Sequence, residues 1–101
     1  MSLAITVNGS HVELSGAVDL QTAPSLNAEL IEMINVAGEG DVLRLDLENV
    51  SLLDSSGLSV LLSAHKLAAD RDVLLTLTGL PRHVERTLSI TGLDEVLDIA
   101  G

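Results

Sequence analysis

Cysteine, phenylalanine, tyrosine and tryptophan are all absent from this chain of 101 residues, and positive charge is scarce. Without cysteine there is no disulfide, no thiolate nucleophile and no cysteine-ligated zinc, which fits an intracellular compartment. Without aromatic rings there is no platform on which nucleic-acid bases stack. Five Lys and Arg residues stand against fifteen Asp and Glu residues, a formal net charge of −10, and the first of these cations is Arg44. Because phosphate backbones bind clustered cations, the composition excludes nucleic acid as a partner.

The sequence shows no stretch typical of a membrane span or of a secretory leader. No apolar run approaches the ~18–20 residues that cross a bilayer, and the N-terminus carries no basic stretch. We therefore expect a cytoplasmic protein without membrane insertion. Hydrophobic residues make up 47% of the chain, which argues against disorder despite the charge. The length predicts one domain over residues 1–101, burying roughly 65% of the unfolded chain's surface.

The first fifteen residues have the hydrophobic pattern of a β-hairpin. Residues 3–7 and 11–15 alternate between apolar and polar side chains, the period of a strand. Asn8-Gly9 between them supplies the positive φ of a tight turn, so the two strands are expected to pair antiparallel. Gly16 is expected to end the second strand.

A helix and a third strand follow the hairpin. Thr22 is expected to be the N-cap, because Pro24 falls in the first turn, where its missing N–H costs little. The apolar stripe of this helix consists of Leu26, Leu30, Met33, Ile34 and Ala37, and Gly38 is expected to end it. The third strand has one apolar face, formed by Leu43, Leu45 and Leu47.

The second half of the chain repeats this alternation of helix and strand. A helix is predicted over residues 56–69, with one side formed by Leu58, Leu61, Leu62, His65 and Ala68 or Ala69. A strand over residues 73–78 and a short helix over residues 82–90 follow, the latter burying Val84, Leu88 and Ile90. Gly92 suits the left-handed position after that helix. Residues 96–99 are predicted to form the last strand.

The resulting order, β-β-α-β-α-β-α-β, predicts an α/β fold with a mixed sheet of about five strands. Strands joined through helices pair parallel through right-handed crossovers, and the first hairpin adds an antiparallel edge. Strands buried on both faces have continuous apolar runs, whereas three of these alternate. We therefore expect the helices to lie mainly on one face of the sheet.

No arrangement of residues typical of an enzyme is present. The histidines, His11, His65 and His83, lack the spacing of a metal site and fall on a strand, a helix and a helix start. The phosphate-binding glycine motifs and GxSxG are absent as well. The acidic pairs within residues 46–48 and 70–72 are expected to be a solvated strand face and a helix exit rather than Mg²⁺ ligands. The sequence predicts no catalytic residue, no metal and no cofactor.

One segment carries a concentration of hydroxyl and carboxylate groups. Residues 51–59 lie between the third strand and the second helix, at the carboxyl end of a parallel strand, where open α/β sheets place their sites. The helix start within it consists of Asp54, Ser55, Ser56 and Gly57. Asp and Ser are favoured N-cap residues, so this tetrapeptide alone is more typical of a cap without further function.

The segment around this tetrapeptide resembles the signature of STAS domains, in particular the stand-alone anti-sigma factor antagonists of bacteria. The closest likeness is over residues 45–62, LDLENVSLLDSSGLSVLL. Residues 14–19 with Thr22-Ala23 resemble the second strand and acidic loop of that family, residues 73–78 its fourth strand, and residues 84–93 its short helix and glycine turn. The resemblance covers essentially the whole chain in the same order.

The resemblance implies a switch protein rather than an enzyme. In such antagonists the serine after the aspartate, here Ser55, is phosphorylated by a partner that is both the anti-sigma factor and a GHKL-type serine kinase. The unphosphorylated form binds this kinase and displaces the sigma factor, and a PP2C-type phosphatase resets it. The partner-binding residues expected from the resemblance are Asp19, Asp54, Ser55, Ser56, Gly57 and Leu58.

The physics of a phosphate at this position is compatible with such a switch. The group adds about −1.5 to −2 charges and sits at a helix N-terminus, which tolerates an anion, so the domain is expected to stay folded. A partner surface packed around Ser55 lacks that tolerance. Two like charges ~5 Å apart at an effective dielectric of ~20 repel by roughly 3 kcal/mol. That energy weakens binding by about a hundredfold.

Two surface features are left open by the sequence. Leu52, Leu53 and Leu58 flank the serine, and each is as compatible with the core as with an exposed partner-binding patch. The chain stops at Gly101 after the last predicted strand, where family antagonists often continue into another helix. If this end leaves a surface exposed, we expect self-association or a partner to cover it. We expect a monomer or a weak homodimer.

Three alternative functions are compatible with parts of the sequence. Some small STAS proteins are accessory subunits of ABC-type lipid transporters, but these tend to have Thr and Gly where this chain has Ser55 and Ser56. A stressosome scaffold component regulated by phosphorylation is the second. An enzyme with a nucleophilic serine is the third, and it is disfavoured because no histidine lies near the motif in the sequence.

Overall fold

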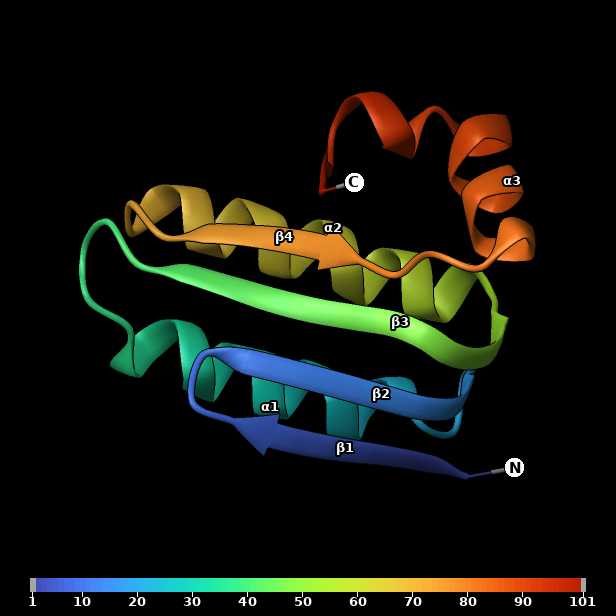
Figure 1. Ribbon diagram of the computed structural model, residues 1–101, viewed down its shortest axis with the longest axis horizontal. Coiled ribbons are helices and arrows are strands. Elements are labelled where there is room, and N and C mark those ends of the chain that lie inside the picture. Colours follow the sequence, from blue (N-terminus) through green and yellow to red (C-terminus); the bar gives the residue numbers. More distant parts are fainter. Residues whose placement is uncertain (1, 101) are drawn as a thin grey trace.

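The computed structural model describes residues 2–100 and has the predicted α/β architecture (Figure 1). Every expected element is present in the expected order. The elements are β1 (Leu3–Asn8), β2 (His11–Val18), α1 (Ala23–Val36), β3 (Val42–Leu53), α2 (Ser55–Asp70), β4 (Leu74–Thr78), α3 (Arg82–Thr91), a 3₁₀ turn (Leu93–Glu95) and β5 (Asp98–Ile99).

The five strands lie side by side in the order β1-β2-β3-β4-β5. The β1 and β2 strands pair antiparallel, and every later pair is parallel, which confirms the mixed sheet with an antiparallel edge. Figure 1 shows α1 and α2 together behind the sheet, with α3 beyond the end of β4. The prediction that the helices lie mainly on one face is therefore confirmed.

The core fills the layer between the sheet and these helices. The alternating leucines of β3 point into it, since Leu45 is 0% and Leu47 is 1% exposed. They meet the stripe of α1 predicted from the sequence, of which Leu26, Leu30, Met33 and Ile34 are buried. Glu13, Arg44 and Glu48 occupy the alternate strand positions and are exposed. In residues 2–100 no helix is long and apolar enough to cross a membrane.

Two strands are longer than the sequence pattern predicts. Gly16 does not end β2, which continues to Val18, because this glycine adopts a φ of +116° at a register irregularity against β3. Similarly, β3 continues to Leu53. In the hairpin, the loop residues are Gly9 and Ser10 rather than Asn8 and Gly9, since Asn8 pairs with His11. Gly9 supplies the positive φ, at +64°.

The helices differ from expectation in which side chains they bury. The buried face of α2 consists of Gly57, Val60, Leu61, Ala64 and Ala68, whereas Leu58, Leu62 and His65 are half-buried. The buried face is rotated about the helix axis relative to the predicted face, because α2 packs against α1 as well as against the sheet. Ile90, expected on the inner side of α3, is 78% exposed. The last strand is Asp98–Ile99, shorter than the predicted residues 96–99. Gly92 has the predicted left-handed conformation.

Leu45 offers a direct test of the packing between the sheet and the helices. We expect Leu45→Ala to lower the free energy of unfolding by about 2–5 kcal/mol, because it leaves a cavity in the close-packed layer. Leu74→Ala is the matched control, since Leu74 lies on the neighbouring strand and is 44% exposed. Urea unfolding of both variants measures the difference, and equal losses would contradict the assigned core.

Candidate functional site

The ends of β2 and β3 place two loops beside each other. Val18, the last residue of β2, pairs with Leu53, the last residue of β3. The backbone N–H of Asp54 then donates a hydrogen bond to the Val18 carbonyl at 3.2 Å. The loop that leads into α1 and the start of α2 therefore lie at the same end of the sheet, on the right in Figure 1. This pairing brings Asp19 next to the predicted Asp-Ser-Ser-Gly segment.

Asp54 is the N-cap of α2, which begins at Ser55, one residue before the predicted start. Its backbone is extended, and its Oδ1 accepts hydrogen bonds from the backbone N–H groups of Ser56 at 2.9 Å and Gly57 at 3.2 Å. Two of the N–H groups that a helix start leaves unpaired are thus satisfied by one carboxylate. The cap fixes where α2 begins and so fixes the position of the next residue, Ser55.

Ser55 is the first residue of α2, and its side chain is exposed. The position expected for it, at the opening turn of the second helix and open to solvent, is confirmed. Ser56, one residue further on, is half-buried. Of the two adjacent hydroxyls, the one at Ser55 is therefore the more accessible to a visiting protein.

Gly57 lies in the first turn of α2 and is buried. A Cβ atom at this position would lie 2.5 Å from Leu53 Cδ1 and 2.7 Å from Val18 Cγ1. Glycine is needed here because the first turn of α2 packs directly on the ends of β2 and β3.

Asp19 is held in a small hydrogen-bonded loop beside this helix start. Its Oδ1 accepts hydrogen bonds from the backbone N–H groups of Thr22 and Gln21, each at 3.0 Å. The Thr22 hydroxyl donates to the Ala17 carbonyl at 2.7 Å instead of capping α1, so the expected side-chain cap is absent. The hydrogen bond from the Thr22 N–H, followed by that from Gln21, holds the pKa of Asp19 below its ordinary value of 3.8 despite some desolvation.

Two exposed leucines lie in the segments that meet at this end of the sheet. Leu52 at the end of β3 is 39% exposed, whereas Leu53 is buried and Leu58 is half-buried against the core. Leu20, in the loop after β2, is 76% exposed. We call Asp19, Leu20, Leu52, Asp54 and Ser55 the α2-start surface. Leu20 was not predicted as part of this surface, because a single leucine in a loop carries no periodic signal.

The α2-start surface is acidic and apolar. Neither loop around it, residues 19–22 and 51–54, contains a Lys, Arg or His. These two loops therefore supply no histidine base for the Ser55 hydroxyl and no basic group to bind an anion. They contribute two carboxylates and two leucines to the α2-start surface, and exposed apolar side chains of this kind are typical of protein-interaction sites.

Comparison with known proteins places this chain in a family. Residues 1–98 match the family model described as Mlab, STAS domain. The chain belongs to the STAS domain family. Among curated proteins it is similar to the anti-sigma-B factor antagonist of Listeria monocytogenes, with 40% identity over 91 residues, covering 88% of this chain and 78% of that protein.

Solved structures show the same fold at lower identity. An anti-sigma factor antagonist from Mycobacterium paratuberculosis superposes with a TM-score of 0.79 and 22% identity, covering 97% of this chain and 83% of that one. The antagonist SpoIIAA in its unphosphorylated form gives 0.75 and 17%, covering 99% and 89%. The phosphorylated form of Bacillus SpoIIAA gives 0.69 and 16%, covering 99% and 92%. The expected STAS fold is confirmed.

The N-cap provides a test of how Ser55 is positioned. We expect Asp54→Ala to destabilise the protein by about 1 kcal/mol, since the N–H groups of Ser56 and Gly57 lose their acceptor. Asp54→Asn is the control, because asparagine caps helices about as well. Urea unfolding at pH 7 measures both, and an equal loss in the two variants would show that hydrogen bonding is not the role of Asp54.

The pKa of Asp19 predicts how its contribution depends on pH. A carboxyl group whose pKa is lower in the folded than in the unfolded chain stabilises the fold above its ordinary pKa. We therefore expect the stability difference between wild type and Asp19→Asn to be constant from pH 7 to about pH 5. It should then shrink below about pH 4, as the folded-state carboxylate becomes protonated. Urea unfolding across this range measures it; a difference that grows on acidification would have the wrong sign.

Proposed function

We propose that this chain is an anti-sigma factor antagonist that is switched off by phosphorylation of Ser55. The observation that carries the proposal is the exposed hydroxyl of Ser55 at the capped start of α2, beside a leucine-framed acidic surface. The 40% identity to an anti-sigma-B factor antagonist supports the same function. That SpoIIAA adopts this fold in both forms supports a switch that leaves the domain folded.

In the unphosphorylated state, the α2-start surface is the docking site for the anti-sigma factor kinase. Leu20 and Leu52 supply exposed apolar area, and Asp19 and Asp54 supply a negative rim. A partner that fits this surface presents apolar pockets with basic groups around them. The GHKL-type kinase implied by the family is expected to dock here and to release its sigma factor. Ser56, Gly57 and Leu58 contribute by positioning the first turn of α2.

Phosphorylation acts on the docked state rather than on the fold. Ser55 is exposed, so a phosphoryl group on it lies outside the core. Asp54 already accepts the N–H groups of Ser56 and Gly57, so the new group lies beside an existing carboxylate rather than taking its place. It adds about −1.5 to −2 charges to a surface with no compensating cation in either adjoining loop. A partner surface fitted to the unmodified serine then loses roughly 3 kcal/mol of binding.

The remaining parts of the proposal follow from this role. The protein works in the cytoplasm as a single domain over residues 1–101, as a monomer or weak homodimer, and it is not an enzyme. A PP2C-type phosphatase returns it to the binding state. The alternative is a STAS accessory subunit of an ABC-type transporter, which needs no modification of Ser55.

Phosphate transfer is tested with GHKL-type kinases from the same genome and ATP, followed by mapping of the phosphate by mass spectrometry. We expect modification at Ser55 that is abolished in Ser55→Ala. It should persist in Ser59→Ala, a control at an exposed serine on the next turn of α2. Ser55→Asp should give the circular dichroism of the wild type and bind the kinase about a hundredfold more weakly by calorimetry.

Three outcomes would overturn the proposal. One is phosphate on a residue other than Ser55. Another is a Ser55→Asp variant that binds the kinase as the wild type does. The third is a tight complex with an ABC-type ATPase together with no modification, which would support the transporter alternative.

A further inference from the structure

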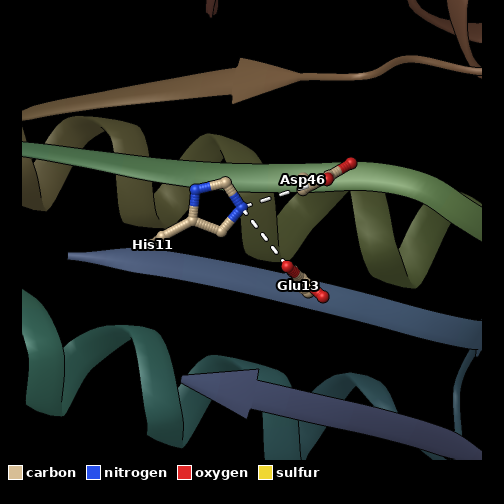
Figure 2. Close-up of side chains that lie close together, drawn as sticks. All are labelled: His11, Glu13 and Asp46. Atoms are coloured by element: carbon tan, nitrogen blue, oxygen red, sulfur yellow. Dashed lines mark ion pairs between the residues drawn. The ribbon is translucent and has the colours of Figure 1, made fainter. Parts of the chain in front are cut away.

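Three potential metal ligands converge on the face of the sheet that α1 and α2 leave uncovered. His11 and Glu13 come from β2 and Asp46 from β3, and Figure 2 shows their side chains pointing toward one another. The His11 Nε2 atom lies 3.8 Å from Glu13 Oε1 and 3.9 Å from Asp46 Oδ2. One ligand atom from each residue lies within 4.8 Å of the other two.

Strand pairing produces this convergence. His11 and Glu13 are two residues apart on β2, so their side chains share a face. Glu13 is the register partner of Asp46 on the parallel neighbour. Two carboxylates directly across a strand pair repel each other, which destabilises the sheet unless a cation lies between them. A divalent cation neutralises both carboxylates.

Asp46 is already oriented for such a role. Its Oδ1 accepts the backbone N–H of Glu48 at 2.9 Å, which leaves Oδ2 directed toward His11. Hydrogen bonds of this kind fix the direction of a ligating carboxylate. Across residues 2–100, no Lys or Arg nitrogen lies within 4.0 Å of a carboxylate oxygen, so neither acid is paired with a Lys or Arg side chain. Arg44, the register partner of His11 on β3, likewise forms no ion pair with either acid.

We propose that His11, Glu13 and Asp46 form a binding site for a divalent transition metal of the Zn²⁺ type. One imidazole nitrogen with two carboxylate oxygens suits Zn²⁺, whereas Mg²⁺ and Ca²⁺ prefer oxygen ligands alone. Ligands of a tetrahedral zinc at ~2.0–2.1 Å lie roughly 3.3 Å apart. The separations of 3.8 and 3.9 Å from His11 Nε2 exceed that value by about 0.5–0.6 Å, and the third separation lies within 4.8 Å, so the three side chains draw closer around a bound ion. The three protein ligands leave a fourth position for water, and the ion links β2 to β3.

This site is independent of the proposed switch. It lies toward the start of β2, whereas the α2-start surface lies where β2 ends. His11, Glu13 and Asp46 are 40%, 57% and 24% exposed at their side chains, so a metal reaches them without unfolding.

The test is a titration of the purified chain with Zn²⁺ alone, followed by calorimetry at pH 7.5. We expect one saturable site that weakens at least about tenfold in His11→Ala, since loss of an orienting partner alone costs 10–100-fold in affinity. His83→Ala is the matched control, because His83 is exposed on α3, away from these carboxylates, and should bind as the wild type does. Glu13→Gln, which keeps the shape of the side chain, should also lose binding.

Two further readouts separate a built site from loose binding to an acidic protein. Co²⁺ in place of Zn²⁺ should give the visible absorption bands of tetrahedral coordination in the wild type and not in His11→Ala. At a free Zn²⁺ concentration ten times the dissociation constant, the melting midpoint should rise by roughly 5–10 °C. The proposal is wrong if the wild type shows no saturable Zn²⁺ binding, or if His11→Ala and Glu13→Gln bind as tightly as His83→Ala.

Discussion

Parallel pairing between β2 and β3 is the interaction on which the rest of the molecule depends. Its last rung, Val18 opposite Leu53, is extended by the hydrogen bond from the Asp54 N–H to the Val18 carbonyl. This contact places the loop with Asp19 and Leu20 beside the start of α2. Further back along the same strands, the register sets Glu13 opposite Asp46. Both the α2-start surface and the proposed metal site are consequences of this one strand pair.

At the start of α2, the residues that stabilise the helix differ from the residue proposed for regulation. Asp54 caps the helix with its own carboxylate, and Gly57 allows the first turn to pack on the strand ends. The exposed Ser55 takes no part in either contact, which is why a change of charge at Ser55 can alter binding while the domain stays folded. A switch of this kind needs no conformational change in the STAS domain; repulsion at a docking surface is sufficient.

The fold was largely predictable from the sequence because its signals are local. Alternating leucines at 43, 45 and 47, the helical stripe of α1 and the Asp54 cap each follow from a few neighbouring residues. The extension of β2 past Gly16 was not predictable, since it depends on a backbone irregularity against β3. The buried face of α2 was misplaced for a similar reason: contact with α1 rotates it.

The candidate site was predictable in part. The Asp-Ser-Ser-Gly motif and its resemblance to STAS antagonists identified Ser55 from contiguous residues. Leu20 was missed because its exposure beside the serine is a matter of tertiary structure. The grouping of His11 and Glu13 with Asp46 was missed for the same reason. The three histidines lack metal-site spacing along the chain. This cluster instead combines one histidine with two acids, which the pairing of β2 with β3 brings together.

The loop after β2 and the start of α2 form one surface, and a charge added at Ser55 leaves the rest of the fold unchanged. Backbone amide NMR spectra of the wild type and of a Ser55→Asp variant test this. We expect shift changes in residues 51–58 and, across the strand pair, in residues 18–22, with the amides of β1, β4 and α3 unmoved. Changes that leave residues 18–22 untouched, or that spread through the whole sheet, would contradict it.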